Sequence, residues 1–142
     1  MIRVVPLSVA DTEAALALYA ELTLGPTDFS PDDFAAVVAH PGTIVFGAKL
    51  GDSIAGMVTL HVLPNVTWGG RPYALMENVV TAPSQRRQGI GRHMLSAAVE
   101  AAWVAGCYKV MVLTGRKRGA KGFYEAIGFS EEDKHGMVIR QA

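Results

Sequence analysis

The stretch that decides the fold is Arg86-Arg87-Gln88-Gly89-Ile90-Gly91-Arg92. Its two glycines let the backbone turn tightly and bring several N–H groups toward one point, and the helix expected to follow adds partial positive charge at its N-terminus. The sequence therefore predicts an anion site that fits a phosphate, and a tight turn with solvated arginines stays open as the alternative. A dinucleotide-binding loop is excluded, because Met94 occupies the position of its third glycine. A nucleotide-triphosphate loop is excluded as well, because no Gly-Lys-Ser/Thr follows.

The elements on either side of this stretch predict a crossover. Residues 73–80 predict a strand, and apolar residues at spacings of three and four predict a helix over 88–105, which Gly106 ends as a C-terminal cap. An apolar strand over 108–113 follows. Strand, helix and strand in this order predict two strands of one sheet joined through the helix, with the anion site where the helix begins.

The remaining elements predict one mixed α/β domain over residues 1–142. Ser30, Pro31 and the two acids after them supply an N-cap, an N1 proline and a negatively charged first turn for one helix. Helices are expected at 10–22, 31–39 and 120–127, and strands at 2–7, 43–49, 53–63 and 137–140. No repeat and no linker interrupts this order, so a single core is expected to support any function.

Composition limits the classes of protein that fit. Half of the 142 residues are hydrophobic and 18% are charged, which suits a packed domain and excludes a disordered chain. Thirteen basic residues balance thirteen acidic ones, so no overall positive field exists for a nucleic acid. Residues 1–71 have three basic and seven acidic residues, a net charge of −4, and residues 72–142 have ten and six, a net charge of +4. An anionic ligand is therefore favoured in the C-terminal half, and a cationic one in the N-terminal half.

Cysteine, histidine and hydropathy patterns exclude further classes. Cys107 is the single cysteine, which allows no intrachain disulfide and predicts a small core residue. No metal is expected, because the four histidines share no metal-ligand spacing; they are His40, His61, His93 and His135. Residues 53–70 are uncharged but contain a proline and several glycines, which excludes a membrane helix, and early acids exclude a signal peptide. A cytoplasmic protein without membrane or nucleic-acid partners is expected.

Two motifs together resemble one known family. The letters R-R-Q-G-I-G at 86–91 fit the Q/R-x-x-G-x-G/A signature of the GNAT superfamily of N-acetyltransferases, and F-Y-E-A-I-G-F at 123–129 fits its downstream F-Y-x-x-x-G-F element. The resemblance implies the GNAT fold, a central mixed twisted sheet of six to seven strands flanked by about four helices. It also implies acetyl-coenzyme A as cosubstrate, against strand 73–80, with its pyrophosphate on the backbone of 87–92. The implied cofactor-binding residues are Val79, Val80, Thr81, Arg86, Arg87, Gln88, Gly89, Ile90, Gly91, Arg92, Lys117, Phe123 and Tyr124.

Strand 73–80 also contains the implied general base. Residues 76–81, M-E-N-V-V-T, and 105–110, A-G-C-Y-K-V, resemble the glucosamine-phosphate N-acetyltransferase branch. In many such enzymes an acid on this strand takes the proton of the acceptor ammonium, often through water, and Glu77 stands there; a carboxylate that only meets solvent or a lysine is the alternative. The resemblance further implies a bulge at 78–80, which points the N–H of Val79 or Val80 at the thioester oxygen.

The tyrosine of the second motif is implied as the general acid. A phenol with a reference pKa of about 10 stays protonated at neutral pH, so Tyr124 can donate to the thiolate of coenzyme A as it leaves. The alternative is an aromatic residue packed in the core. Lys117 departs from the family pattern, because members commonly have an asparagine there that contacts coenzyme A. The basic run at 116–121 is therefore an alternative contact for the 3′-phosphate, or a solvated run.

These features predict an N-acetyltransferase that acts on a primary amine of a small molecule by direct transfer in a ternary complex, since no motif positions a residue to carry the acetyl group. A non-catalytic acyl-coenzyme A sensor stays open, although it has no need of Glu77 and Tyr124, as does an acetyltransferase of protein lysines or N-termini. A homodimer is expected, because small members of the family are frequently dimers. Candidates for the acceptor pocket are Tyr19, Leu24, Asp28, Phe29 and Trp68.

Overall fold

The computed structural model describes residues 1–22, 25–115 and 119–141. The chain divides into two compact units, Met1–Val112 and Leu113–Ala142. The first unit contains β1 (Ile2–Pro6), α1 (Thr12–Leu22), α2 (Pro31–Ala39), β2 (Thr43–Leu50), β3 (Ser53–Leu63), β4 (Tyr73–Thr81), α3 (Ile90–Val104) and β5 (Val110–Val112). Three 3₁₀ turns also belong to it: η1 (Val9–Asp11), η2 (Trp68–Gly70) and η3 (Pro83–Gln85). The second unit contains α4 (Lys121–Glu125).

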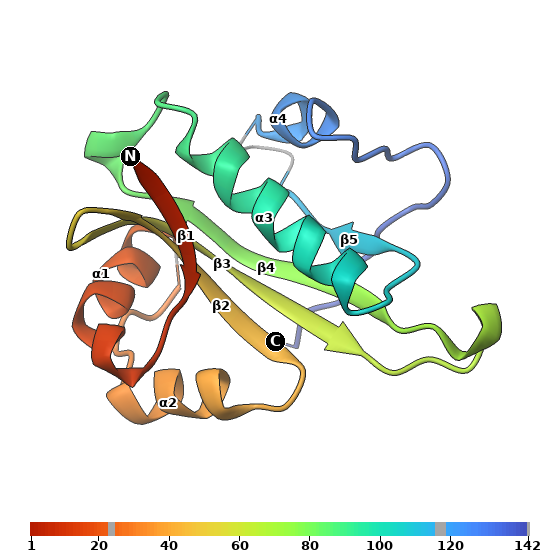
Figure 1. The fold of residues 1–142 in the computed structure, drawn as a ribbon, viewed down its shortest axis with the longest axis horizontal. Coiled ribbons are helices and arrows are strands. Elements are labelled where there is room, and N and C mark those ends of the chain that lie inside the picture. Colours follow the sequence, from red (N-terminus) through yellow and green to blue (C-terminus); the bar gives the residue numbers. More distant parts are fainter. Residues whose placement is uncertain (23–24, 116–118, 142) are drawn as a thin grey trace. The chain divides into compact units, whose positions relative to one another are not determined.

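The sheet of the first unit is mixed, as predicted. Its five strands lie in the order β1-β2-β3-β4-β5, antiparallel except for the last pair, in which β4 and β5 run parallel (Figure 1). The chain passes from β4 to β5 through α3, which is the predicted crossover. The register pairs Leu60 with Met76, and both side chains are fully buried at the centre of the sheet.

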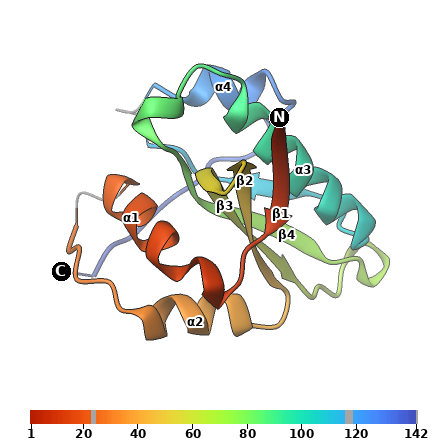
Figure 2. The same ribbon diagram turned by 60° about the vertical axis from the view of Figure 1, so that its left-hand side comes forward.

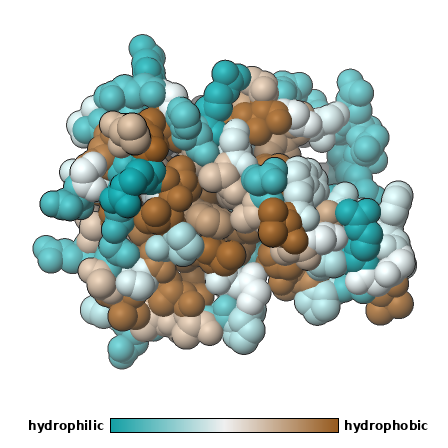
Figure 3. Space-filling model, viewed as in Figure 1, coloured by the Kyte–Doolittle hydropathy of each residue, from teal (hydrophilic) through white to brown (hydrophobic). Residues whose placement is uncertain are grey.

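Helices cover both faces of this sheet. Figures 1 and 2 show α3 on one face and α1 with α2 on the other. The face under α1 and α2 is packed around Leu18, Phe34, Val45, Met57 and Val80, all of them buried. In the space-filling view, hydrophobic residues gather where β1 and β2 lie in Figure 1, with hydrophilic residues around them (Figure 3). Both faces of the sheet therefore have an apolar core, as a mixed α/β layer arrangement requires.

Local signals explain where the helices begin and end. Ser30 is the predicted N-cap of α2 and forms a capping box, since its hydroxyl accepts from the N–H of Asp33 at 3.1 Å and its own N–H donates to the Asp33 carboxylate at 3.2 Å. α3 begins at Ile90 rather than at 88, because Gly89 has a φ of 77° and cannot be helical. It ends at Val104, and Gly106 beyond it has a φ of 88° and donates to the carbonyl of Trp103 in a Schellman-type cap.

One predicted strand is wrong. Residues 137–140 form no strand, and the sheet has five strands rather than six to seven. The prediction rested on the β-propensity of Met137, Val138 and Ile139, but a strand also needs a neighbour for its backbone N–H and C=O groups. These residues pair with no strand in the described part of the chain. Helix 120–127 is likewise shorter than expected, and α4 ends at Glu125.

Candidate active site

The predicted bulge is present in β4. Met57 of β3 pairs with Val80, but Thr59 pairs with Glu77, so Asn78 and Val79 together stand opposite the one residue between Met57 and Thr59. Asn78 has a φ of 53°, the left-handed conformation that lets the strand accommodate the extra residue. The close approach on the β3 side needs a glycine, because a Cβ on Gly56 would lie 2.8 Å from the carbonyl oxygen of Val80. Gly56 thus permits the close approach of β3 to the bulged part of β4.

The bulge lies where β4 loses its neighbour. β5 pairs with β4 only from Ala74 to Met76 and ends at Val112, whereas β4 continues to Thr81. Within the first unit, the segment from Glu77 to Thr81 is therefore paired with β3 on one side and with no strand on the other. On that side its backbone meets no strand of the first unit, which is the arrangement that accepts an extended ligand along a sheet edge.

The N-terminus of α3 follows directly and has no side-chain cap. Its N-cap is Gly89, in the left-handed conformation, and Arg87 two residues earlier is also left-handed with a φ of 66°. The first N–H groups of a helix lack partners within the helix, and no side chain caps them here, so they are available to an anion. Arg86 is held at the end of β4, because its Nε donates to the carbonyl of Thr81 at 3.3 Å. The predicted residues 79–81 and 86–92 thus lie on either side of η3, at the end of β4 and the start of α3.

The face of the sheet under α1 contains Glu77. Thr59 and Glu77 are register partners across β3 and β4, so their side chains lie on the same face. Thr59 is buried and hydrogen-bonds to Tyr19 of α1, which identifies this face as the one that α1 covers. Glu77 itself is exposed. We call the face that carries Thr59, Glu77 and Tyr19 the acceptor face.

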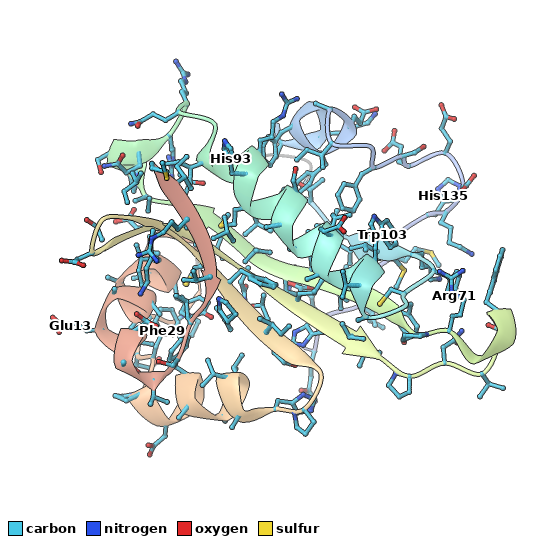
Figure 4. The ribbon with its side chains drawn as sticks, viewed as in Figure 1. Glu13, Phe29, Arg71, His93, Trp103 and His135 are labelled. Atoms are coloured by element: carbon cyan, nitrogen blue, oxygen red, sulfur yellow. The ribbon has the colours of Figure 1, made fainter. Side chains whose placement is uncertain are left out.

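Tyr19 is fixed by aromatic contacts. Its ring meets Phe29 and Phe34 edge to face, with both centroids 6.2 Å away, and Phe29 lies beside α1 (Figure 4). Burial raises the pKa of the Tyr19 hydroxyl, although the side-chain hydrogen bond with Thr59 lowers it. Because the pKa is raised on balance, Tyr19 is a neutral hydroxyl at physiological pH. Two of the predicted pocket residues, Tyr19 and Phe29, are thereby brought together.

Three further polar residues of this region were not predicted from the sequence. Thr59 is buried on the acceptor face, and a hydroxyl among the apolar residues of β3 was the signal that could have identified it. The others are the histidines His40 and His61, whose Nδ1 atoms lie 3.0 Å and 2.8 Å from the same hydroxyl oxygen, that of Thr43. The sequence spacing of the two histidines does not indicate this pairing, because they are connected only through hydrogen bonds to the Thr43 hydroxyl.

Trp68 has a different surrounding from the one predicted. Its ring stacks on Tyr108 with centroids 5.0 Å apart and planes 14° apart. It precedes β4 and so lies at the Tyr73 end of that strand, whereas Glu77 and the bulge lie toward the Thr81 end. Trp68 is thus largely exposed and stacked on Tyr108, and its place in the acceptor pocket stays a prediction. Leu24, also predicted for the pocket, lies outside the described residues.

The second unit contains Tyr124, the predicted general acid. Tyr124 lies in α4, and its ring meets Phe123 at 5.3 Å and Phe129 at 5.9 Å, both edge to face. The F-Y-x-x-x-G-F element thus forms one aromatic cluster. Lys121 forms an exposed ion pair with Glu131, and this hydrogen bond and charge raise the pKa of Lys121. Lys117 lies outside the described residues.

Cys107 is buried, as a core cysteine should be, and burial raises the pKa of its thiol. Over residues 1–22, 25–115 and 119–141, no three His, Cys, Asp or Glu side chains are grouped so that they could hold a metal ion. None of the helices described is long and apolar enough to span a bilayer.

Comparison with protein families identifies the fold just described. Residues 8–129 match the model of the acetyltransferase (GNAT) family. The chain belongs to the GNAT acetyltransferase family. The predicted family and mixed α/β fold class are therefore confirmed. The region that matches the GNAT family contains both the bulged strand β4 and the helix α3, whose N-terminus has no side-chain cap.

Individual GNAT proteins agree with this assignment. A glucosamine 6-phosphate N-acetyltransferase of Trypanosoma brucei brucei is 34% identical over 92 residues, which cover 65% of this chain and 61% of that protein. An aminoalkylphosphonate N-acetyltransferase of Salmonella typhimurium is 30% identical over 127 residues, covering 85% and 80%. The solved structure of a putative acetyltransferase from Agrobacterium tumefaciens superimposes with a TM-score of 0.91 at 39% identity, covering 98% and 99% of the two chains. The match to the trypanosomal protein thus spans less than two thirds of that relative.

Proposed function

We propose that this GNAT protein is an acetyl-coenzyme A-dependent N-acetyltransferase that acts on a primary amine of a small molecule. One observation carries the proposal: the bulge at Asn78 and Val79 lies on the unpaired edge of β4, one short loop before the uncapped N-terminus of α3. An extended thioester with an anionic end fits that arrangement, because the strand edge offers backbone polar groups and the helix offers free N–H groups. Acetyl-coenzyme A supplies the activated acetyl group.

The residues proposed to bind it follow from this order along the chain. Val79, Val80 and Thr81 lie along the thioester and its arm, and the N–H of Val79 or Val80 donates to the thioester oxygen as negative charge develops there. The backbone of 87–92 and the N-terminus of α3 hold the pyrophosphate. From the family pattern we assign Lys117 and Phe123 to the same cosubstrate.

Two side chains are proposed to move protons. Glu77 receives a proton from the acceptor ammonium, directly or through water, because only the neutral amine has a lone pair for attack. Tyr124 donates its phenolic proton to the coenzyme A sulfur, so that the leaving group departs as a thiol. The attack is direct, in a ternary complex, so the acetyl group passes from sulfur to nitrogen without resting on the protein.

The acceptor is proposed to be a small amine because both curated relatives are named for such substrates, glucosamine 6-phosphate and aminoalkylphosphonate. We further propose a single catalytic domain over residues 1–142, a homodimer, and a cytoplasmic location. The test is a thiol-release screen with acetyl-coenzyme A and a panel of amines, including aminosugar phosphates, aminoalkylphosphonates, polyamines, amino acids, aminoglycosides and a lysine peptide. Thiol release with small amines supports the proposal, release with the peptide alone favours a protein acetyltransferase, and binding without release favours a sensor.

A further inference from the structure

A hydrogen-bonded group of three side chains adjoins the acceptor face. Thr43 of β2 is 8% exposed, and its Oγ1 lies 3.0 Å from Nδ1 of His40 and 2.8 Å from Nδ1 of His61. His61 of β3 is the register partner of Thr43, and His40 caps the C-terminus of α2, where it is exposed. We call these residues the His-Thr-His group. It joins a ring on the sheet to a ring in solvent through one buried hydroxyl.

Counting protons restricts how this group is bonded. A threonine hydroxyl has one hydrogen, so Thr43 can donate to one histidine only and must accept from the other. If both contacts are hydrogen bonds, at least one of the two rings therefore carries its proton on Nδ1. Either Thr43 donates to His40 and accepts from His61, which leaves Nε2 of His61 with a free lone pair, or the bonds run the other way.

The register places His61 beside Glu77. Thr59 pairs with Glu77 and His61 pairs with Leu75, so His61 and Glu77 are diagonal neighbours on the acceptor face. Such neighbours have Cα atoms about 7–8 Å apart, within the reach of long side chains and wide enough for one ammonium group between them. Because Nδ1 of His61 is bound on the β2 side, Nε2 is the ring nitrogen left for a ligand, and none of the described side chains bonds to it.

We propose that His61 is a second proton acceptor for the substrate amine, and that Thr43 and His40 are the residues that position it. In the proposed state Nδ1–H of His61 donates to Thr43, and Thr43 donates to His40. The N–H bond of the ammonium breaks, the proton bonds to Nε2 of His61, and the electron pair stays on the amine nitrogen for attack. Nδ1–H keeps its bond to Thr43 throughout, so the new imidazolium needs no rearrangement. The proposal rests on the proposed function.

His61 and Glu77 have distinct parts in the proposed step. The neutral imidazole accepts the proton at the lone pair of Nε2. The carboxylate in turn attracts the ammonium. Other ionisable side chains around His61 are Tyr73 on the same face of β4, Tyr19 on α1 and His40 at the end of α2. Asp32 and Asp33 lie in the first turn of α2, at its other end, and Lys49 lies near the far end of β2.

The first readout is the tautomer of His61 in the wild-type protein, measured from the ring ¹⁵N shifts under conditions in which both rings are neutral. The proposal expects Nδ1–H on His61 and Nε2–H on His40. An Nε2–H tautomer on His61 would overturn it, because the lone pair would then face Thr43. This measurement needs neither substrate nor turnover.

The second readout is kcat/KM against pH for variants. His61→Asn retains an amide in place of Nδ1 but has no Nε2, so kcat/KM at pH 7 should fall about 10²-fold, and the loss should shrink toward the pKa of the amine. Thr43→Val removes the hydroxyl, so kcat/KM should fall with the same dependence on pH. Thr43→Ser keeps the hydroxyl and should show the wild-type pH profile. His135→Asn is the matched control with a wild-type profile, since His135 is an exposed residue of the second unit and is not among the residues proposed to bind or react (Figure 4).

The outcomes separate this inference from the proposed function. An active wild type whose pH profile is unchanged in a folded His61→Asn variant overturns the role of His61 and leaves the acetyltransferase standing. A wild type that acetylates no amine overturns both. If Thr43→Val unfolds, Thr43→Ser with the wild-type profile and His61→Asn with the altered one still support the proposal.

Discussion

The phosphate site can be tested with two variants that differ only in charge. Gly89 has a φ of 77°, and a Cβ added there would meet no other atom within 4 Å, so the cost of a side chain is backbone strain and not a clash. Asn and Asp tolerate the left-handed conformation better than other residues with a side chain. Gly89→Asn and Gly89→Asp should therefore fold with similar melting temperatures and obstruct the site to a similar extent.

Their affinities for coenzyme A should nevertheless differ widely. A carboxylate within about 5 Å of a bound pyrophosphate charge costs about 3 kcal/mol at an effective dielectric constant of about 20. This corresponds to about 10²-fold in Kd between the two variants. Isothermal titration calorimetry at low salt measures the difference, and added salt should reduce it by screening. Equal affinities for the Asn and Asp variants would refute the placement of the pyrophosphate at the start of α3.

Four further variants test other parts of the account. Tyr124→Phe removes only the hydroxyl, so kcat should fall by about 10²-fold or more with nearly constant coenzyme A affinity, and an unchanged kcat would return Tyr124 to a packing role. Glu77→Gln should lower kcat/KM near neutral pH by an amount that shrinks as pH approaches the pKa of the amine; a loss equal at every pH would remove Glu77 as a base. The raised pKa of Tyr19 means that folding favours its neutral form, so stability should be constant below about pH 10 and decrease as pH rises through the raised pKa, and Tyr19→Phe should flatten this decrease in thermal melts. Leu60→Ala at the fully buried centre of the sheet should cost about 2–5 kcal/mol in urea unfolding, and a cost below about 1 kcal/mol would contradict the packing described for this position.

Most of the fold was predictable because its signals are local. The N-cap at Ser30, the glycines that flank α3 and the apolar run of β3 each act within a few residues, and the corresponding elements appear where they were expected. The strand at 137–140 failed because propensity describes one segment and pairing needs two. The sequence of that segment does not indicate whether another strand lies beside it to pair with.

The part of the candidate site that is continuous in sequence was predictable, whereas the residues brought together by strand pairing were not. The segment from the bulge to the start of α3 is continuous in sequence, so its motif located it. Thr59, Thr43 and His61 join the acceptor face only through the register of β2, β3 and β4, which depends on long-range pairing. A one-residue shift of β3 would place Thr59 and His61 on the opposite face, under α3. Their connection to Glu77 and to His40 therefore required the structure.

The most direct test of direct acetyl transfer is intact-mass spectrometry in two steps. The wild-type protein is first incubated with acetyl-coenzyme A alone, and then with the best amine from the screen. The account predicts an unmodified protein in the first step, and free coenzyme A with acetylated amine in equal amounts in the second. An acetyl group on the protein that the amine then removes, or coenzyme A binding without any acetylated amine across the panel, would contradict it.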